Sequence, residues 1–161
     1  AIESALTGHL VFSTLHTNDA AGAVTRLQDM GVEGYLISSS LLAIQAQRLV
    51  RRVCTECAET HPLSLDEARV LDIDSAECAE IRRGKGCERC GQTGYRGRVG
   101  LYELLLMSDE IRHQIASGAD ANSIRDTAIK GGMRTLRQDA LEKLRAGLTT
   151  PEEVVRVTRA V

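Results

Sequence analysis

Apolar side chains follow one another almost without interruption from His9 to Leu15, in a run of strand length (HLVFSTL). A strand covered on both faces shows this continuous pattern, as in a parallel sheet with helices on each side. Asn18 or Asp19 can then cap a helix that ends near Met30, because an apolar face recurs at helical spacing after these residues. This part of the chain therefore predicts an α/β arrangement.

The later apolar pattern predicts a strand between two helical regions. A second helix is expected over 34–43, and the segment 45–53 either continues it or, as we favour, forms a buried strand. Ser64 and Glu67 form a capping-box pattern for a short helix that ends near Leu71. The other expected elements are a strand over 98–107 and helices over 108–116, 122–129, 135–146 and 151–159.

Four of the five cysteines form two Cys-x-x-Cys pairs, Cys54 with Cys57 and Cys87 with Cys90. Two residues between thiolates is the spacing of a tight turn that presents both sulfurs to one ion, so the pairs together predict a tetrahedral Zn²⁺ site. Four thiolates leave no position open for water or substrate, and the predicted zinc is therefore structural. Cys78 stands outside the pairs and is expected to be a small core residue.

Composition narrows the class of protein. An odd number of cysteines and no secretory signal peptide disfavour a disulfide framework, and reduced cysteines indicate a cytoplasmic location. The net charge is −2, no apolar run has the length of a membrane span, and with 2% aromatic residues the core must consist of Leu, Val, Ile and Ala. The chain lacks an initiator methionine and begins like the end of a helix, so we expect it to be a piece of a longer protein.

The segment GHLVFSTLHTNDA carries the candidate chemistry. In open α/β sheets ligands bind beyond the carboxyl ends of the strands, which is where His16 would emerge. His16 is either a functional residue or a hydrogen-bonded residue before a helix cap, and His9 is expected to be structural. The chain has no phosphate-binding loop, since Gly84-Lys85-Gly86 has neither the spacing nor the following hydroxyl, so no segment can hold a triphosphate by itself.

Basic side chains gather before the first cysteine pair and around the second. They are Arg48, Arg51, Arg52, Arg82, Arg83, Lys85, Arg89, Arg96 and Arg98. Nucleic-acid binding is one interpretation, but Tyr95 is the only aromatic residue nearby and three glutamates dilute the charge. We therefore favour solvated charge, contact with acidic lipid headgroups, or contact with a neighbouring subunit.

Three segments together resemble a known family: residues 8–54, GQTGYRGRVGLYELLLMSDEIR after the second cysteine pair, and GGMRTLRQDALEKLRAGLTTPEEVVRVT. They are similar to the C-terminal part of the secretion-traffic ATPases, above all the type II secretion ATPases, with the type IV pilus assembly ATPases as near relatives. The resemblance implies an α/β fold, namely the C-terminal part of a RecA-like ATPase core with an inserted tetracysteine zinc subdomain and an all-helical C-terminal tail. It divides the chain into 1–53, 54–98 and 99–161.

The resemblance also implies roles for particular residues. GHLVFSTLHTNDA is similar to the histidine box of these ATPases, which implies that His16 senses or positions the γ-phosphate, with Thr14 and Thr17 beside it. By the same resemblance Arg98 lies near the nucleotide or the subunit interface. The paired cysteines are similar to the metal-binding subdomain of the family.

The implied parent protein is a homohexamer that hydrolyses ATP with Mg²⁺ at the cytoplasmic face of the inner membrane. Its partners would be the inner-membrane secretion platform proteins, and its motion would drive pseudopilus assembly. The phosphate loop, the acidic box and the Walker B glutamate are absent here, so we expect this chain alone to be inactive. The rival hypothesis is a free-standing zinc module that binds a protein or nucleic acid. A phosphate loop encoded upstream would decide against it.

Overall fold

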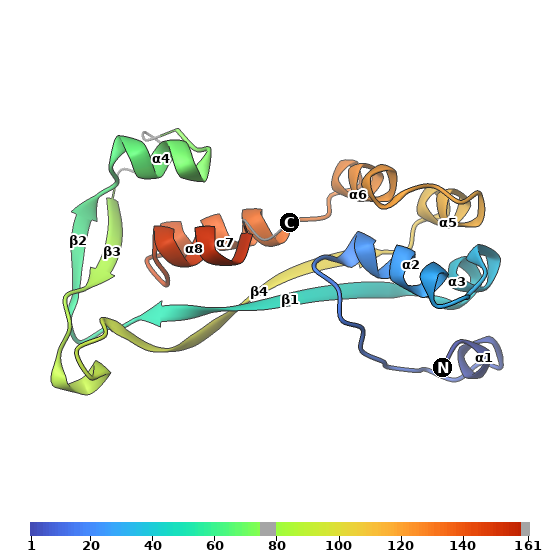
Figure 1. Ribbon diagram of the computed structural model, residues 1–161, viewed down its shortest axis with the longest axis horizontal. Coiled ribbons are helices and arrows are strands. Elements are labelled where there is room, and N and C mark those ends of the chain that lie inside the picture. Colours follow the sequence, from blue (N-terminus) through green and yellow to red (C-terminus); the bar gives the residue numbers. More distant parts are fainter. Residues whose placement is uncertain (75–79, 159–161) are drawn as a thin grey trace. The chain divides into compact units, whose positions relative to one another are not determined.

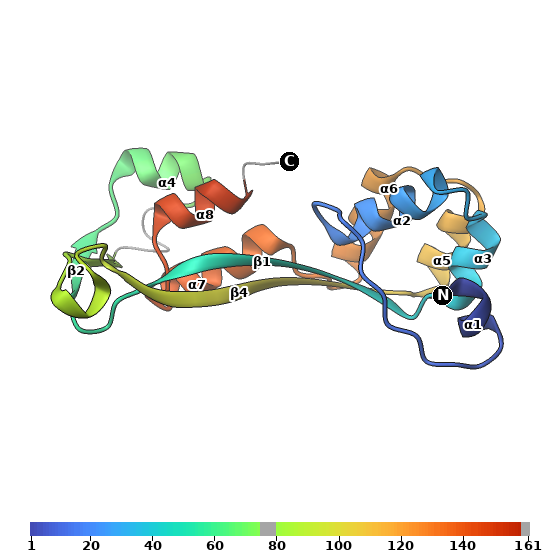
Figure 2. The same ribbon diagram turned by 60° about the horizontal axis from the view of Figure 1, so that its bottom comes forward.

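The structure is a computed structural model that describes residues 1–74 and 80–158, and Figures 1 and 2 show its labelled elements. The chain divides into two compact units. The first unit contains Ala1–Ala46 and Tyr102–Thr135, and the second contains Gln47–Leu101 and the segment from Leu136 onward. Within the described ranges, no helix combines the length and apolar character that crossing a membrane requires.

The first unit is mainly helical. Its helices are α1 (Ile2–Leu6), α2 (Ala20–Asp29), α3 (Gly34–Ser40), α5 (Asp109–Ala116) and α6 (Ala121–Lys130). Helix α2 packs against α6. It buries the apolar face that the sequence predicted, including Ala23 and Val24. Helix α3 lies so close to α5 that a Cβ on Gly34 would come 2.6 Å from the carbonyl oxygen of Ile115. Glycine at this position therefore allows the two helices to approach.

Two long strands, β1 (Ala43–Val53) and β4 (Tyr95–Leu106), lie side by side as a two-stranded sheet (Figure 1). The boundary between the units falls within both strands. The second half of β4 alternates strictly, with Leu101, Glu103 and Leu105 buried and the residues between them exposed. This alternation has the period of a strand with one covered face. The strands expected over 45–53 and 98–107 are thus confirmed.

The second unit contains a short pair of antiparallel strands. Its elements are β2 (Ala58–Pro62), α4 (Leu65–Leu71), β3 (Glu80–Gly84), the 3₁₀ turn η1 (Glu88–Cys90), α7 (Leu136–Arg145) and α8 (Pro151–Thr158). Strands β2 and β3 pair antiparallel, with Ala58 opposite Gly84. The sequence did not predict this pair because Ile81 is its only buried residue, which leaves no apolar alternation to detect.

The short helix α4 begins where its capping box predicted. The Ser64 hydroxyl accepts a hydrogen bond from the Glu67 amide at 3.2 Å, and the Glu67 carboxylate accepts one from the Ser64 amide at 3.0 Å. Each side chain therefore satisfies a backbone donor that the first helical turn leaves free.

The C-terminal helix α8 fixes the end of β1, from which the first cysteine pair begins. Glu153 is fully buried and accepts hydrogen bonds from the Arg51 amide (2.7 Å), the Arg51 Nε (3.0 Å) and Arg156. Burial alone would raise the pKa of Glu153, but these hydrogen bonds lower it to about 2. The Arg51 guanidinium also lies 4.1 Å from the centre of the Tyr95 ring. Glu153 is therefore ionised at neutral pH and holds Arg51 in place.

The strand predicted for His9–Leu15 is wrong for this structure. Residues 9–17 belong to no helix or strand, and Phe12 is 89% exposed. A strand needs hydrogen-bonding neighbours as well as apolar side chains, and the two sheets of the described residues, β1–β4 and β2–β3, do not include this segment. The helix predicted after it is confirmed, and Asp19 is its cap, with Oδ1 accepting from the Gly22 amide at 2.7 Å.

Candidate metal centre and histidine segment

The two cysteine pairs lie at the ends of strands that hold them together. Cys54 follows the last residue of β1 and Cys57 precedes β2. Cys87 precedes the turn η1 that follows β3, and Cys90 is the last residue of that turn. Because β2 and β3 pair along their whole length, the turn before one and the turn after the other come to the same end of the pair. The hydrogen bond from the Lys85 amide to the Cys57 carbonyl, 3.1 Å long, extends this pairing up to the cysteines.

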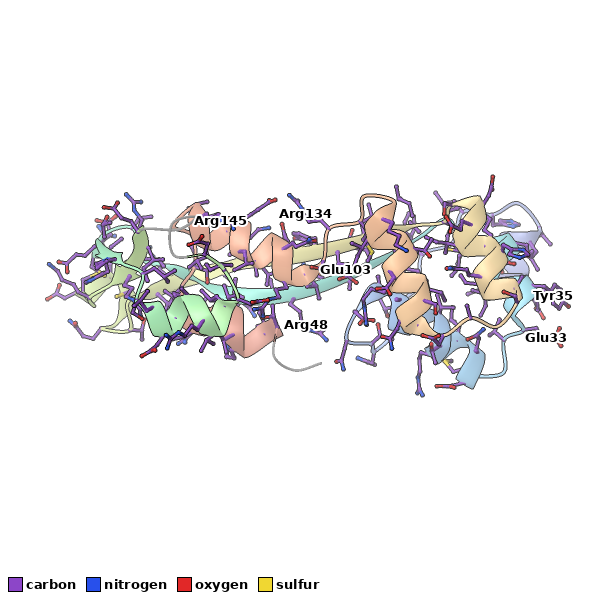
Figure 3. The ribbon with its side chains drawn as sticks, turned by 90° about the horizontal axis from the view of Figure 1, so that it is seen from above. Glu33, Tyr35, Arg48, Glu103, Arg134 and Arg145 are labelled. Carbon is purple, nitrogen blue, oxygen red and sulfur yellow. The ribbon has the colours of Figure 1, made fainter. Side chains whose placement is uncertain are left out.

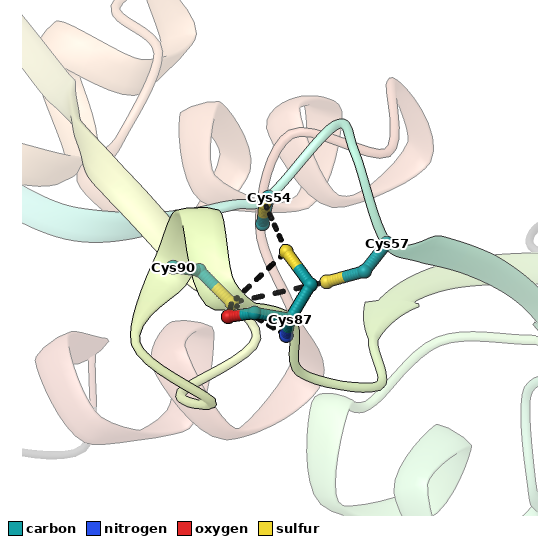
Figure 4. A group of neighbouring side chains, drawn as sticks. All are labelled: Cys54, Cys57, Cys87 and Cys90. Atoms are coloured by element: carbon teal, nitrogen blue, oxygen red, sulfur yellow. Dashed lines mark hydrogen bonds between the residues drawn. The ribbon is translucent and has the colours of Figure 1, made fainter.

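The four sulfur atoms converge in one place (Figure 4). All lie within 4.8 Å of one another. The Sγ atoms of Cys54 and Cys87 are 3.9 Å apart, those of Cys57 and Cys90 are 3.9 Å apart, and those of Cys87 and Cys90 are 3.7 Å apart. A tetrahedron with Zn–S bonds of about 2.3 Å has edges of about 3.8 Å. The sulfur positions therefore fit a tetrahedral metal ion.

The backbone around the second pair favours thiolate at Cys90. Its Sγ accepts hydrogen bonds from the Cys87 amide at 3.2 Å and the Gly94 amide at 3.3 Å. Burial opposes ionisation, yet these amides and the neighbouring thiols lower the pKa of Cys90 to about 6. Burial raises the pKa of Cys57 to about 12, so this thiol ionises only when a cation offsets the cost. One sulfur is thus prepared as a thiolate, and the cluster as a whole favours a bound cation.

Glycines allow the tight backbone around the cysteines. Gly91 has a φ of 60° directly after Cys90, a left-handed conformation that glycine adopts without a steric cost. Gly84 and Gly94 lie in direct contact, and a Cβ on either would collide with the backbone of the other. The Gly94 carbonyl in turn accepts a hydrogen bond of 2.9 Å from the Cys54 amide. The contact between these two glycines therefore joins the first cysteine pair to the second.

The cluster can hold an ion but cannot catalyse at it. Cys54, Cys57 and Cys90 are buried, and Cys87 is partly exposed. Four protein ligands complete a tetrahedral shell, and no coordination position remains for a reacting water. Cys78, which we expected to be a core residue, lies outside the described residues. The site is therefore a candidate structural metal centre, as predicted from the spacing.

The remaining predicted site residues lie elsewhere. We define the histidine segment as residues 8–18, between α1 and α2. It carries Thr14 and His16, both exposed, and Thr17, whose Oγ1 donates to the Asp19 carbonyl at 3.1 Å. Arg98 is exposed on the part of β4 that belongs to the second unit. The structure thus brings Thr14, His16 and Thr17 onto one segment, and their roles remain predictions.

Asp19, Glu103 and Arg125 meet where the histidine segment ends, and the sequence did not predict a functional role for any of them. Asp19 forms an ion pair with Arg125 of α6, and the Glu103 carboxylate accepts a hydrogen bond of 2.9 Å from the Ala20 amide. Asp19 and Glu103 are buried, 8% and 3% exposed. Asp19 was identified only as a possible helix cap, and no local pattern marks Glu103 or Arg125, because their contacts join distant parts of the sequence.

Three features together indicate the class of protein: the mixed helices and strands, the clustered cysteines and the helical C-terminal segment. A model of the type II/IV secretion system protein family matches residues 1–156, so the chain belongs to this family. The fold agrees with a solved structure of the pilus retraction motor PilT with bound ADP, with a TM-score of 0.60 at 24% identity over 98% of this chain and 36% of that one. The expected fold class and family are thus confirmed.

Named relatives come from both secretion and pilus machines. The chain is 52% identical to the type IV pilus assembly ATPase PilB of Thermus thermophilus over 157 residues, which is 96% of this chain and 18% of that protein. It is 46% identical to the type II secretion system ATPase E of Vibrio cholerae and 49% identical to the type II secretion system protein E of Pectobacterium carotovorum, covering 99% of this chain and 31% of each. The chain therefore spans less than a third of these relatives.

Proposed function

We propose that this chain is the C-terminal portion of a hexameric ATPase that powers type II protein secretion by driving pseudopilus assembly. The observation that carries the proposal is the family match over residues 1–156. The relatives named as type II secretion system ATPase E and protein E support it, since the similarity to each covers nearly the whole chain. The free-standing zinc module loses support because the match extends far beyond the cysteines.

Type IV pilus assembly is the second candidate. The pilus assembly ATPase PilB of Thermus thermophilus is 52% identical to this chain, a higher identity than that of the two type II relatives above. Both candidates imply the same chemistry, ATP hydrolysis with Mg²⁺ in the complete protein, and differ in the fibre that is assembled.

In this proposal the four cysteines hold a structural Zn²⁺. When bound, the ion supplies a cross-link between the turn after β1 and the turn after β3, and it takes no part in hydrolysis. The sulfur separations of 3.7–3.9 Å support zinc over a pair of disulfides, which would need sulfurs about 2.0 Å apart. The chain's own residues would thus brace a subdomain too small to bury a large core.

The proposed role of His16 is to position or sense the γ-phosphate of ATP, with Thr14 and Thr17 beside it. His16 is exposed, as a residue that meets a ligand supplied from elsewhere must be. Arg98 is also exposed and is proposed to face a nucleotide or a neighbouring subunit of the homohexamer. This chain has no phosphate loop, so it would contribute only the γ-phosphate edge of a complete site.

We place the complete protein at the cytoplasmic face of the inner membrane, bound to the secretion platform proteins. Acidic lipid headgroups are a further proposed contact for exposed basic residues such as Arg52 and Arg96. Nucleic acid is disfavoured because part of the basic cluster is already paired with glutamates. Arg51 pairs with Glu153, Arg83 with Glu67 and Glu152, and Lys85 with Glu59.

The test is ATP turnover in the full-length hexamer. His16→Ala should lower kcat by roughly 100-fold and leave the affinity for a non-hydrolysable ATP analogue within a few-fold, because a γ-phosphate sensor acts after binding. His9→Ala is the matched control, since His9 lies in the same segment and its ring hydrogen-bonds to Ser4 of α1 and to Thr7 just after α1. The chain of 161 residues alone should release no phosphate. Unchanged turnover in His16→Ala removes His16 from the site, and a full-length hexamer without ATPase activity overturns the proposed function.

A further inference from the structure

We propose that Arg125 and Glu103 are positioning residues for His16: together they fix the backbone where the histidine segment enters α2. The inference rests on the proposed function, because it concerns how His16 is presented to a phosphate. It assigns to α6 and β4 a part in the ATPase site through Arg125 and Glu103, neither of which is proposed to touch the nucleotide.

Asp19 and Ala20 are held from several directions within the first unit. Asp19 Oδ1 accepts from the Gly22 amide at 2.7 Å, while Asp19 Oδ2 pairs with the Arg125 guanidinium. The next amide, of Ala20, donates to the Glu103 carboxylate at 2.9 Å. The Asp19 carboxylate, which caps α2, thus pairs with a cation from α6, and the Glu103 carboxylate on β4 accepts a hydrogen bond from the next amide. Figure 3 marks Glu103 on its strand.

These contacts are buried, whereas the histidine segment itself is not. The side chains of Asp19 and Arg125 are 12% and 28% exposed, and Glu103 is 3% exposed. Each contact ties the backbone at Asp19 or Ala20 to another element of the first unit, so together they restrict how this point can move. Residues 9–17 lie outside helices and strands. The junction between the histidine segment and α2, at Asp19 and Ala20, is therefore the fixed point nearest to His16.

His16 lies three residues before Asp19. One further hydrogen bond, made by Thr17, restricts the backbone between Asp19 and His16. Thr17 Oγ1 donates to the Asp19 carbonyl at 3.1 Å, which bends the backbone directly after His16. A catalytic group displaced by about 1 Å can lose as much as 100-fold in rate, so a loosened junction would be felt at the imidazole. Helix capping alone does not need Arg125 or Glu103, since Oδ1 of Asp19 already caps α2.

The test uses the full-length hexamer and measures kcat, KM for ATP, affinity for a non-hydrolysable ATP analogue and Tm. Arg125→Ala should lower kcat roughly tenfold with KM changed less than about twofold, because positioning is lost while binding is kept. Arg125→Lys should recover part of the loss, since it restores a positive charge but not the planar guanidinium. Asp19→Asn should also lower kcat, because asparagine keeps the capping oxygen but not the charge.

The decisive measurement is made in the His16→Ala background. If Arg125 acts through His16, adding Arg125→Ala there should lower kcat no further. Ser108→Ala is the matched stability control: it removes the N-cap of α5 in the same unit, far in sequence from the histidine segment, and should lower Tm without lowering kcat.

When His16→Ala and Arg125→Ala both lower kcat, two results still overturn the inference. One is a further loss of kcat when Arg125→Ala is combined with His16→Ala, and the other is a Ser108→Ala loss of kcat equal to that of Arg125→Ala. Normal turnover in Arg125→Ala beside a defective His16→Ala removes only this inference. Normal turnover in His16→Ala itself removes the proposed role of His16, and the inference with it.

Discussion

The cysteine cluster and the histidine segment differ in how far contacts within this chain hold them. Every ligand of the cluster comes from this chain, and strands, glycine contacts and amide hydrogen bonds place the four sulfurs within 4.8 Å of one another. The histidine segment has apolar side chains that a fold would bury, yet Phe12 is 89% exposed and the segment is anchored beside α2. The comparison teaches that paired strands and hydrogen bonds within the chain assemble a cluster, whereas apolar side chains without a paired neighbour do not form a strand.

The largest effect expected is the loss of the metal. Cys90→Ser should reduce zinc from one ion per chain to none and should unfold β2 and β3, because structural zinc contributes an apparent binding free energy of roughly 10 kcal/mol or more. Zinc is measured by mass spectrometry on protein purified without chelator, and β2–β3 by amide hydrogen exchange. Exchange in α2 should stay unchanged, since α2 belongs to the other unit.

Cys78→Ser is the control for this change, because it alters a cysteine outside the two pairs. It should leave one zinc per chain. Wild-type protein that contains no zinc would contradict the assignment of the cluster, and zinc retained by Cys90→Ser would show that the ion sits elsewhere.

A smaller effect is expected from the glycine contact that joins the cysteine pairs. Gly94→Ala places a Cβ against the Gly84 backbone at a φ of 75°, so it should destabilise the second unit by about 3 kcal/mol or more. Gly97→Ala is a close match, because Gly97 has a φ of 76° and its added Cβ would meet no atom within 4 Å beyond its chain neighbours. Gly97→Ala should destabilise the protein by only about 1–2 kcal/mol, which is the cost of placing alanine in the left-handed backbone conformation. Chemical denaturation measures both, and equal losses would exclude the close contact as the cause.

The same comparison shows how far the sequence could predict the structure. Local signals were sufficient for helix starts, as at Ser64 with Glu67, since a capping box involves residues within one turn. The cysteine spacing likewise predicted that the four sulfurs come together where they could hold one ion. The strand at His9–Leu15 failed because apolar content shows that a segment can be buried but does not supply its neighbours. Arg125 and Glu103 were missed because their partners lie 106 and 83 residues away in sequence.

The smallest effect is expected in the histidine segment, where Phe12→Ala should change the stability of this chain by no more than about 0.5 kcal/mol, because the ring is already in solvent. The family resemblance implies a RecA-like core in the full-length protein, whose sheet would cover the segment, and there the same change should cost about 3–5 kcal/mol through the cavity it leaves. Denaturant unfolding of both proteins measures the difference. Leu105→Ala is the control, since Leu105 is fully buried by residues of this chain and should cost about 2–5 kcal/mol in both. An equal effect of Phe12→Ala in the two proteins would show that the segment is equally solvated in both, and the contrast between the cysteine cluster and the histidine segment would then fail.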